Sequence, residues 1–225
     1  VRAILLDISS PGGAVSACDE IYSALRRFRE SREDRRIIAF VRDLAASGGY
    51  YLAVAADHIL VQPTAIVGSI GVLFESLNWH QLTQKIGVDA AVVKSGEHKD
   101  LMNPFRPVDS NHVEILKRIV DDAYGRFCEL VAKGRNLPDE KVRSFADGSV
   151  FTALDALERK MIDAIGFWED ALRATEEQLG VEAVRVVRYE DRPRLLRELF
   201  GADAVAAAQR LTLRTGPQLL TIWAP

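Results

Sequence analysis

IIAFVRDLAASGGYYLAVAA, residues 37–56, has the most informative pattern of apolar and small residues in the chain. Residues 37–41 form a short apolar run typical of a buried strand, and residues 52–56 are apolar on every side, as in a buried helix. Between them, AASGGYY (45–51) surrounds one hydroxyl, that of Ser47, with small residues. The stretch therefore predicts a strand, a tight turn and a helix, with Ser47 at the turn.

The same organisation occurs earlier in the chain. Residues 1–8 are an apolar run, SSPGG (9–13) predicts a turn, and apolar residues then recur at helical spacing as far as about Arg36. Further strands are predicted at residues 59–61, 88–93 and 183–189, with β-forming residues interrupted by glycines at 66–72. Further helices are predicted at residues 77–86, 109–133, 138–145, 153–160 and 168–178, with Asp109 or Ser110 as a cap. Alternating strands and helices predict an α/β fold.

The composition excludes several classes of protein. A chain of 225 residues that is 48% hydrophobic can bury a sizeable core, and its formal net charge of −3 gives no basic surface for nucleic acid. The two cysteines and four histidines have no metal-ligand spacing, so neither a metal centre nor a disulfide framework is expected. The residues given contain no signal-peptide pattern and no apolar run of about eighteen residues, so this stretch is not expected to span a membrane. Because its first residues read as a strand already under way, it is expected to be a fragment of a longer protein.

Ser47 is the first candidate for chemistry. At a strand-to-helix turn the first backbone N–H groups of the helix have no partner and carry the positive end of the helix dipole, which stabilises anions. The small neighbours leave room for a substrate backbone, and the N–H of Gly48 could point at an oxyanion that forms when the hydroxyl attacks a carbonyl. A plain helix N-cap is the alternative interpretation of the same serine.

A serine nucleophile needs a neighbouring base. His58 is the nearest histidine in sequence, but no acidic partner with triad spacing can be named for it. A neutral lysine in a dry pocket is the other possibility, and KSGEHKD (94–100) contains two, Lys94 and Lys99. The residues alone do not distinguish a catalytic lysine from a solvated one. SSPGG adds a second group of N–H donors, suited to the other half of an oxyanion hole or to a phosphate, although it lacks the spacing of nucleotide-binding loops.

Several motifs in a fixed order carry a resemblance to a known family. They are SPGG (10–13), ASGGYY (46–51), VGSIGV (67–72) and KSGEHKD (94–100), followed by GRNLPDEKVRSFADGSVFTALDAL (134–157) and VVRYEDRPRLLRELFG (186–201). In this order the segments resemble the signal peptide peptidase A (SppA) family of serine–lysine peptidases, over nearly the whole chain.

The resemblance implies a role for five residues. Ser47 matches the nucleophile, and Lys99, the second lysine of its motif, matches the general base. Ser69 matches the hydroxyl that orients the lysine amine, and Gly13 and Gly48 match the N–H donors of the oxyanion hole. By the same match the other lysine of the motif is a bystander.

The resemblance also implies an architecture and a biological setting. It implies a ClpP/crotonase-like superhelix of repeated ββα units and a homo-oligomer in which neighbouring protomers supply the serine and the lysine. Residues 1–170 are expected to form the peptidase core, and residues 171–225 a helix–strand–helix extension that packs on the core or on a neighbour. The implied substrates are extended apolar peptides such as signal peptide remnants, cleaved at the membrane of the cell envelope without a cofactor.

Two other functions remain open at this point. A crotonase-like enzyme would use the amides of Gly13 and Gly48 to hold the enolate of an acyl-CoA, although this interpretation gives no reason for Ser47, Ser69 and Lys99 to occur together. An inactive scaffold, or a phage-type relative of the same fold, would bind peptides without cutting them.

Overall fold

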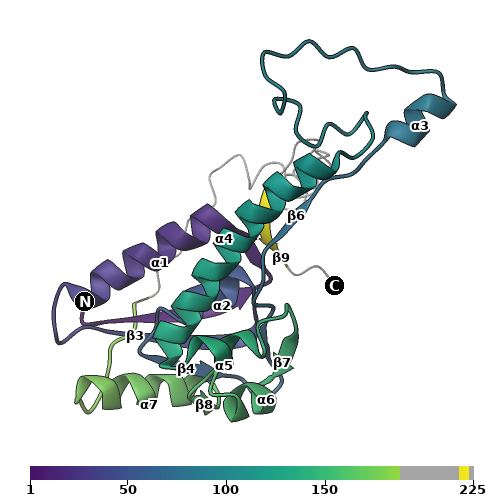
Figure 1. Ribbon diagram of the computed structural model, residues 1–225. Helices are drawn as coiled ribbons and strands as arrows, with labels where there is room; N and C mark the ends of the chain where they lie inside the picture. The colour runs from purple at the N-terminus through teal and green to yellow at the C-terminus, as the bar shows by residue number, and fades with distance from the viewer. Residues whose placement is uncertain (188–217, 223–225) are drawn as a thin grey trace, which may run out of the picture.

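The computed structural model describes residues 1–187 and 218–222 of the chain (Figure 1). Within them the main sheet has the strand order β7-β5-β3-β4-β8, and β1 pairs with β3. The strands are β1 (Ala3–Ser10), β3 (Arg36–Ala46), β4 (His58–Val61), β5 (Ile66–Gly68), β7 (Val150–Thr152) and β8 (Ala164–Ile165). With helices on both faces of this sheet, the predicted α/β class is confirmed.

The long strand β3 organises the main sheet. β1 and β4 pair in parallel with the same part of β3, so they occupy its two opposite edges. β5 then pairs in parallel with Leu44–Ala46, farther along the edge that β4 uses. Because both edges and both faces of β3 are covered, its residues 37–41 are almost fully buried, which explains the continuous apolar run in the sequence.

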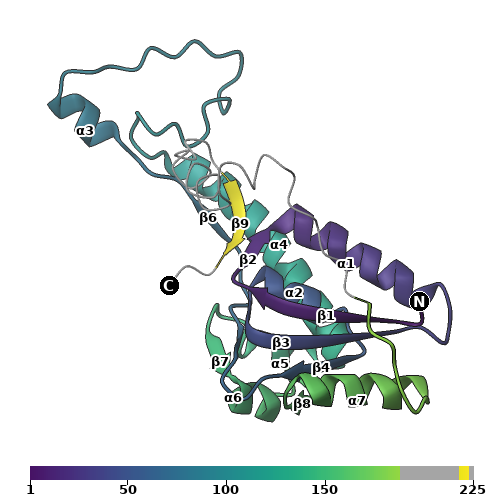
Figure 2. The ribbon, with the colours of Figure 1, turned by 180° about the vertical axis from the view of Figure 1, so that it is seen from behind.

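The two faces of the sheet are covered by different helices (Figures 1 and 2). Alternate side chains of β3 pack on one face with residues of α1 (Val15–Glu30), α2 (Gly48–Ala53) and α4 (Ser110–Arg135). Phe40 points to the other face, where its ring meets Trp168 of α7 (Trp168–Leu179) edge to face, with 5.6 Å between the centroids. The strand–turn–helix unit of residues 37–56 is therefore the centre of the core.

The helices agree with the predicted pattern except at their ends. α1 ends at Glu30, whereas the helical pattern of the sequence continues to about Arg36, which instead begins β3, and α2 ends at Ala53 and not at Ala56. α4 begins where Asp109 caps it by accepting a hydrogen bond from the N–H of Asn111 at 2.8 Å. The shorter helices are α5 (Asp139–Arg143), α6 (Ala153–Glu158) and α3 (His80–Lys85). The last of these begins three residues later than predicted, at His80, whose N–H donates to the side-chain oxygen of Asn78 at 3.1 Å just before the helix.

Two predicted strands differ from the structure. Residues 88–93 form no strand, since none of the strands in the described part of the chain pairs with them, and Val93 is fully exposed. Residues 183–187 also form no strand, and the remainder of that prediction lies outside the described residues. An apolar run predicts a strand only if the fold supplies a partner for it.

A second, antiparallel sheet leads away from the main one. Its order is β2-β9-β6, formed by β2 (Gly12–Ala14), β9 (Gln218–Ile222) and β6 (Leu73–Glu75). Beyond β6 the chain continues into α3 and a long loop before it returns in α4, and Figures 1 and 2 show this segment extended away from the main sheet. We call residues 76–109 the arm.

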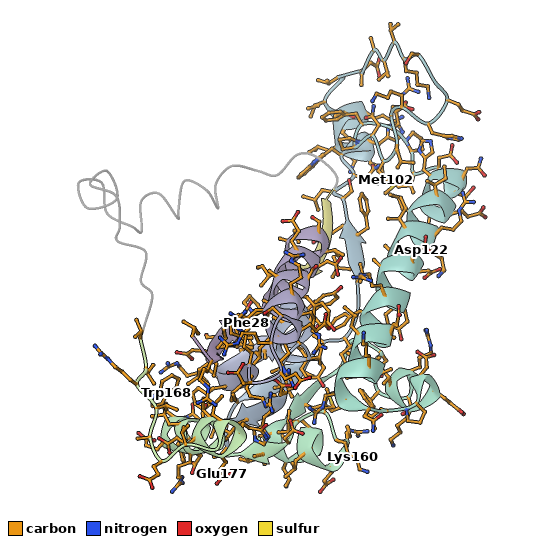
Figure 3. All side chains as sticks on the ribbon, turned by 90° about the vertical axis from the view of Figure 1, so that its left-hand side faces the viewer. Phe28, Met102, Asp122, Lys160, Trp168 and Glu177 are labelled. Atoms are coloured by element: carbon orange, nitrogen blue, oxygen red, sulfur yellow. The ribbon has the colours of Figure 1, made fainter. Side chains whose placement is uncertain are left out.

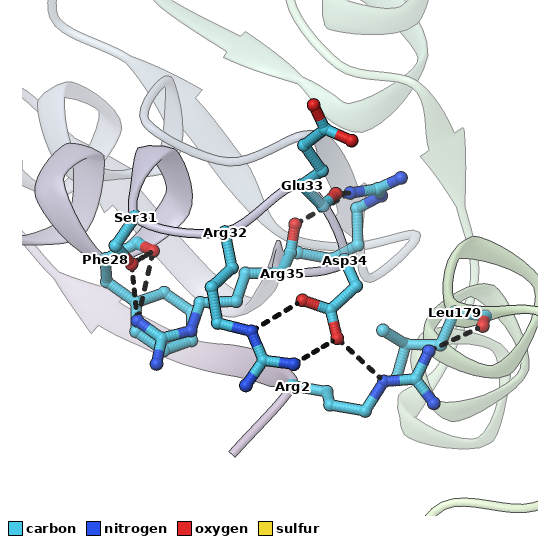
Figure 4. A network of polar contacts seen from close by, with 9 residues as sticks. Arg2, Phe28, Ser31, Arg32, Glu33, Asp34, Arg35 and Leu179 are labelled. Atoms are coloured by element: carbon cyan, nitrogen blue, oxygen red, sulfur yellow. Dashed lines mark hydrogen bonds and ion pairs between the residues drawn. The ribbon is translucent and has the colours of Figure 1, made fainter.

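A polar network closes the end of the sheet at which β1 and β3 begin (Figure 4). Arg2 donates to the carbonyl of Leu179 at 3.2 Å and lies 3.6 Å from the carboxylate of Asp34, which also pairs with Arg32 at 2.8 Å. These side chains are largely exposed, so the network defines the path of the chain between α1 and β3 more than it adds to stability. No helix among the described residues is long and apolar enough to span a bilayer.

One close approach gives a direct test of this packing. A Cβ atom added to Gly134 of α4 would lie 2.4 Å from the carbonyl oxygen of Val54, which follows α2. We expect Gly134→Ala to lower the free energy of unfolding by about 1–3 kcal/mol, because one of the two helices must shift. Gly125→Ala is the matched control on the same helix: nothing lies within 4 Å of its added Cβ, and it should raise stability by up to about 1 kcal/mol. Urea unfolding of both variants measures the difference, and equal effects would contradict the predicted contact.

Candidate active site

Ser47 lies in a strained turn between β3 and α2. Its backbone has φ 51° and ψ −115°, a conformation that costs a residue with a side chain about 1–3 kcal/mol. The residue is almost fully buried, and its side chain makes no capping hydrogen bond. The turn therefore holds the hydroxyl away from the backbone of the helix, which argues against the simple N-cap interpretation of this serine.

Ser69 lies beside Ser47 because of the sheet register. Ala46 pairs with Gly68, and the N–H of Ser47 donates to the carbonyl of Gly68 at 2.8 Å. Both serines thus follow directly after the ends of neighbouring parallel strands. Ser69 also has a positive φ, 50°, and is 8% exposed. Its own N–H donates to the carbonyl of Ser149 at 2.7 Å, so this turn is fixed from a third segment of the chain.

The two glycines predicted to form an oxyanion hole lie in adjoining segments. Gly48 is the first residue of α2 and is buried, and Gly13 lies in β2 just after the end of β1. A Cβ atom added to Gly49 would be 2.8 Å from the carbonyl oxygen of Ser10. The start of α2 therefore lies directly against the segment that contains SPGG, which only glycine permits at this distance.

Two tyrosines anchor α2 on either side. Tyr51 donates to the carboxylate of Asp19 at 2.6 Å, and Arg126 of α4 donates to the same oxygen at 2.7 Å. Burial and the hydrogen bond to Asp19 raise the pKa of Tyr51, so it stays a neutral donor. Tyr50 is fully buried and donates to the carbonyl of Met161 at 2.8 Å. No local pattern in the sequence predicts the Asp19–Arg126 pair, since its members are far apart in the chain.

Lys99 lies on the arm, and a single chain does not bring it to Ser47. It belongs to the loop between α3 and α4, its side chain is exposed, and its backbone N–H donates to the carbonyl of Gly96 at 3.1 Å. Both ribbon views place this loop far from α2, and Figure 3 labels Met102 of the same loop at the end of the molecule opposite Lys160. Among the predicted site residues, Ser47, Ser69, Gly13 and Gly48 are close together and Lys99 is apart from them.

His58 lies at the wrong end of the sheet to serve as a base. It pairs with Ile38 near the beginning of β3, nine residues before Ser47. At about 3.3 Å per residue the two ends of β3 are separated by roughly 30 Å. Within residues 1–187 and 218–222, no group of three or more His, Cys, Asp or Glu side chains could hold a metal ion.

A strained serine at the carboxyl end of a parallel strand, followed at once by a helix, is a feature of serine hydrolases. Comparison with known proteins specifies the class. Residues 29–182, more than half of the chain, match the sequence profile described as Peptidase family S49. The chain belongs to this family and is a serine-type peptidase, which confirms the resemblance to SppA peptidases.

Individual relatives support the same assignment. The chain is 40% identical to a Synechocystis protein described as a protease, over 90% of this chain and 73% of the relative. It is 31% identical to an Enterococcus faecium protein described as signal peptide peptidase SppA, over 99% of this chain and 64% of the relative. It is 32% identical to a Methanocaldococcus jannaschii protein described as a protease, over 84% of this chain and 60% of the relative. The chain thus spans less than two thirds of the second and third of these relatives.

Proposed function

We propose that this protein is a serine endopeptidase in which Ser47 is the nucleophile and Lys99 of a neighbouring copy is the general base. The observation that carries the proposal is the strained, buried turn of Ser47 directly beside Ser69. Positive-φ turns at residues other than glycine cost free energy and are concentrated at functional sites. Two of them at adjoining strand ends have a ready explanation if both hydroxyls act together.

The proposed reaction follows from this arrangement. The Ser47 oxygen attacks the peptide carbonyl carbon, and its proton passes to the amine of Lys99, which Ser69 orients. The N–H groups of Gly13 and Gly48 stabilise the oxyanion. The C–N bond then breaks, the lysine returns its proton to the leaving amine, and water hydrolyses the serine ester.

The contacts of the two lysines support Lys99 as the base. The ammonium of Lys94 lies 2.5 Å from a carboxylate oxygen of Asp100 and 2.6 Å from the carbonyl of Glu97, so its donors are engaged in holding the loop. Among the residues that the structure describes, the Lys99 ammonium has no hydrogen bond or ion pair. Of the two lysines in this motif, Lys99 is therefore the one whose ammonium is available to a group on another chain.

The surface of the arm supports a homo-oligomer. In a single chain the arm exposes many large apolar side chains, and such surfaces mark interaction sites. They are Leu77, Trp79, Leu82, Ile86, Val88, Val93, Phe105 and Val108. We propose that the arm packs on a second copy of the chain and there brings Lys99 to Ser47, within a ClpP/crotonase-like superhelical assembly.

The proposed substrates are extended apolar peptides, among them signal peptide remnants. The Enterococcus faecium relative is described as a signal peptide peptidase, and extended peptides commonly bind by strand addition. We also propose that the protein works at the membrane of the cell envelope, with residues 1–170 as the peptidase core and residues 171–225 as an extension.

A trapping experiment tests the proposed function. The assembled protein is incubated with an apolar, signal-sequence-like peptide and with a charged peptide of the same length. We expect only the apolar peptide to be cut, and an acylating inhibitor to add one group to Ser47, located by peptide mass spectrometry. A peptide that binds and persists uncut would favour an inactive scaffold, and tight CoA binding without cleavage would favour the acyl-CoA alternative.

A further inference from the structure

The loop that carries Lys99 is built around one buried carboxylate. The side chain of Asp100, the next residue, is only 8% exposed, although most residues of the arm are exposed. Lys94 reaches one of its oxygens at 2.5 Å and Arg106 the other at 3.5 Å. A carboxylate is removed from water only if it is paired, so the cluster is a specific piece of structure and not a chance surface contact.

The hydrogen bonds of this cluster join the two ends of the loop. Lys94 also donates to the carbonyl of Glu97 at 2.6 Å, so one ammonium holds both sides of the turn at residues 97–100. The carbonyl of Asp100 accepts from the N–H of Asn103 at 3.0 Å, and the carbonyl of Asn103 accepts from the N–H of Arg106 at 3.3 Å. Asp100 thus binds residues that precede and follow Lys99.

The charge on the Asp100 carboxylate allows the cluster to persist at neutral pH. The hydrogen bond from Lys94 lowers the pKa of the Asp100 carboxyl, although desolvation acts in the opposite direction. The carboxylate is therefore ionised at neutral pH and keeps both of its cationic partners.

The side chains of the adjacent residues Asp100 and Lys99 lie in different surroundings. A cavity of about 520 Å³ lies under the loop, and Lys94, Asp100 and Arg106 line it together with Asn78 and His112. Lys99 is not among the residues that line this cavity, and its side chain is exposed. The two neighbouring side chains therefore leave the backbone in different directions, one into the loop and one out of it.

We propose that Asp100, bound by Lys94 and Arg106, is a positioning residue that fixes the direction in which Lys99 leaves the arm. The inference rests on the proposed function, in which Lys99 is the base. It gives a role to Lys94, which the resemblance left as a bystander: Lys94 acts on catalysis only through the Asp100 carboxylate. A base displaced by about 1 Å can lose on the order of 10²-fold in rate.

The kinetic test compares three variants in the assembled protein. Asp100→Asn keeps the shape of the side chain and removes its charge, and Asp100→Glu keeps the charge. Asp139→Asn is the matched control, because Asp139 forms an ion pair with Arg143 at 2.6 Å but has a side chain that is 54% exposed. We expect Asp100→Asn to lower kcat by about 10- to 100-fold with KM within about twofold, Asp100→Glu to recover part of the loss, and the control to match the wild type.

Hydrogen exchange provides a second measurement that does not depend on activity. Amides of residues 96–106 should exchange faster in Asp100→Asn than in the wild type or in Asp139→Asn, while light scattering shows the same assembly. Unchanged exchange, or faster exchange with unchanged kcat, overturns the positioning role. A Lys99→Ala variant that cleaves as fast as the wild type removes the base itself and with it this role; exchange would then still show whether Asp100 orders the loop.

Discussion

Ser47→Ala is expected to lower the rate of peptide cleavage by about 10⁴-fold or more, because it removes the hydroxyl proposed to form the acyl-enzyme. The fold should survive the change: the hydroxyl makes no capping hydrogen bond, so its loss leaves no partner unsatisfied. Alanine also retains the strain at φ 51°, whereas glycine would relieve it. We therefore expect Ser47→Gly to be equally inactive but more stable than Ser47→Ala in thermal unfolding.

The control for this experiment is Ser144→Ala, which removes an exposed hydroxyl after α5. It should keep wild-type activity. Cleavage by Ser47→Ala at more than a few per cent of the wild-type rate, with contaminating proteases excluded by a second purification tag, would contradict the assignment of the nucleophile.

Lys99→Ala is expected to lower kcat by about 10²- to 10⁴-fold, the usual contribution of a general base. The structure adds a sharper expectation, since the lysine and the serine lie on different parts of the chain. Each inactive variant, Lys99→Ala and Ser47→Ala, still carries the residue that the other lacks. Co-assembled in equal amounts, they should recover about a quarter of the wild-type activity, the fraction of head-to-tail contacts that join an intact serine to an intact lysine.

Two controls make the mixing experiment decisive. Ser47→Ala co-assembled with a Ser47→Ala/Lys99→Ala chain must remain inactive, because no chain supplies the serine. Lys85→Ala, which removes another exposed lysine of the arm, should behave as the wild type. Failure to recover activity in assemblies shown to contain both chains would mean that the dyad is not shared between neighbours.

The local structure around the nucleophile follows from the sequence. The apolar run, the small residues and the second apolar run predict β3, its turn and α2, and Asp109, the cap of α4, is one of the two residues predicted for that role. The juxtaposition of Ser47 and Ser69 does not follow from any local pattern. It depends on β5 taking the place after β4 on the same edge of β3, and such a register is decided by the whole sheet.

The arm shows a second limit of sequence analysis. Its polar loop looks like a solvated connection, yet a buried carboxylate organises it. The pattern of charges in KSGEHKD does not reveal which residue turns inward, because that depends on Arg106 and on the walls of the cavity. The run at residues 88–93 is likewise typical of a strand, but none of the described strands pairs with it.

The shared edge of β3 has a consequence for how the protein is made. During synthesis residues 36–46 emerge before residues 66–68, and the turn after β3 has its full set of hydrogen bonds only when β5 has added to the strand. Contacts of this kind between distant parts of a chain form late in folding. A growing or unfolded chain therefore lacks an organised nucleophile, and we expect it to be unable to cleave either itself or its neighbours before the sheet is complete.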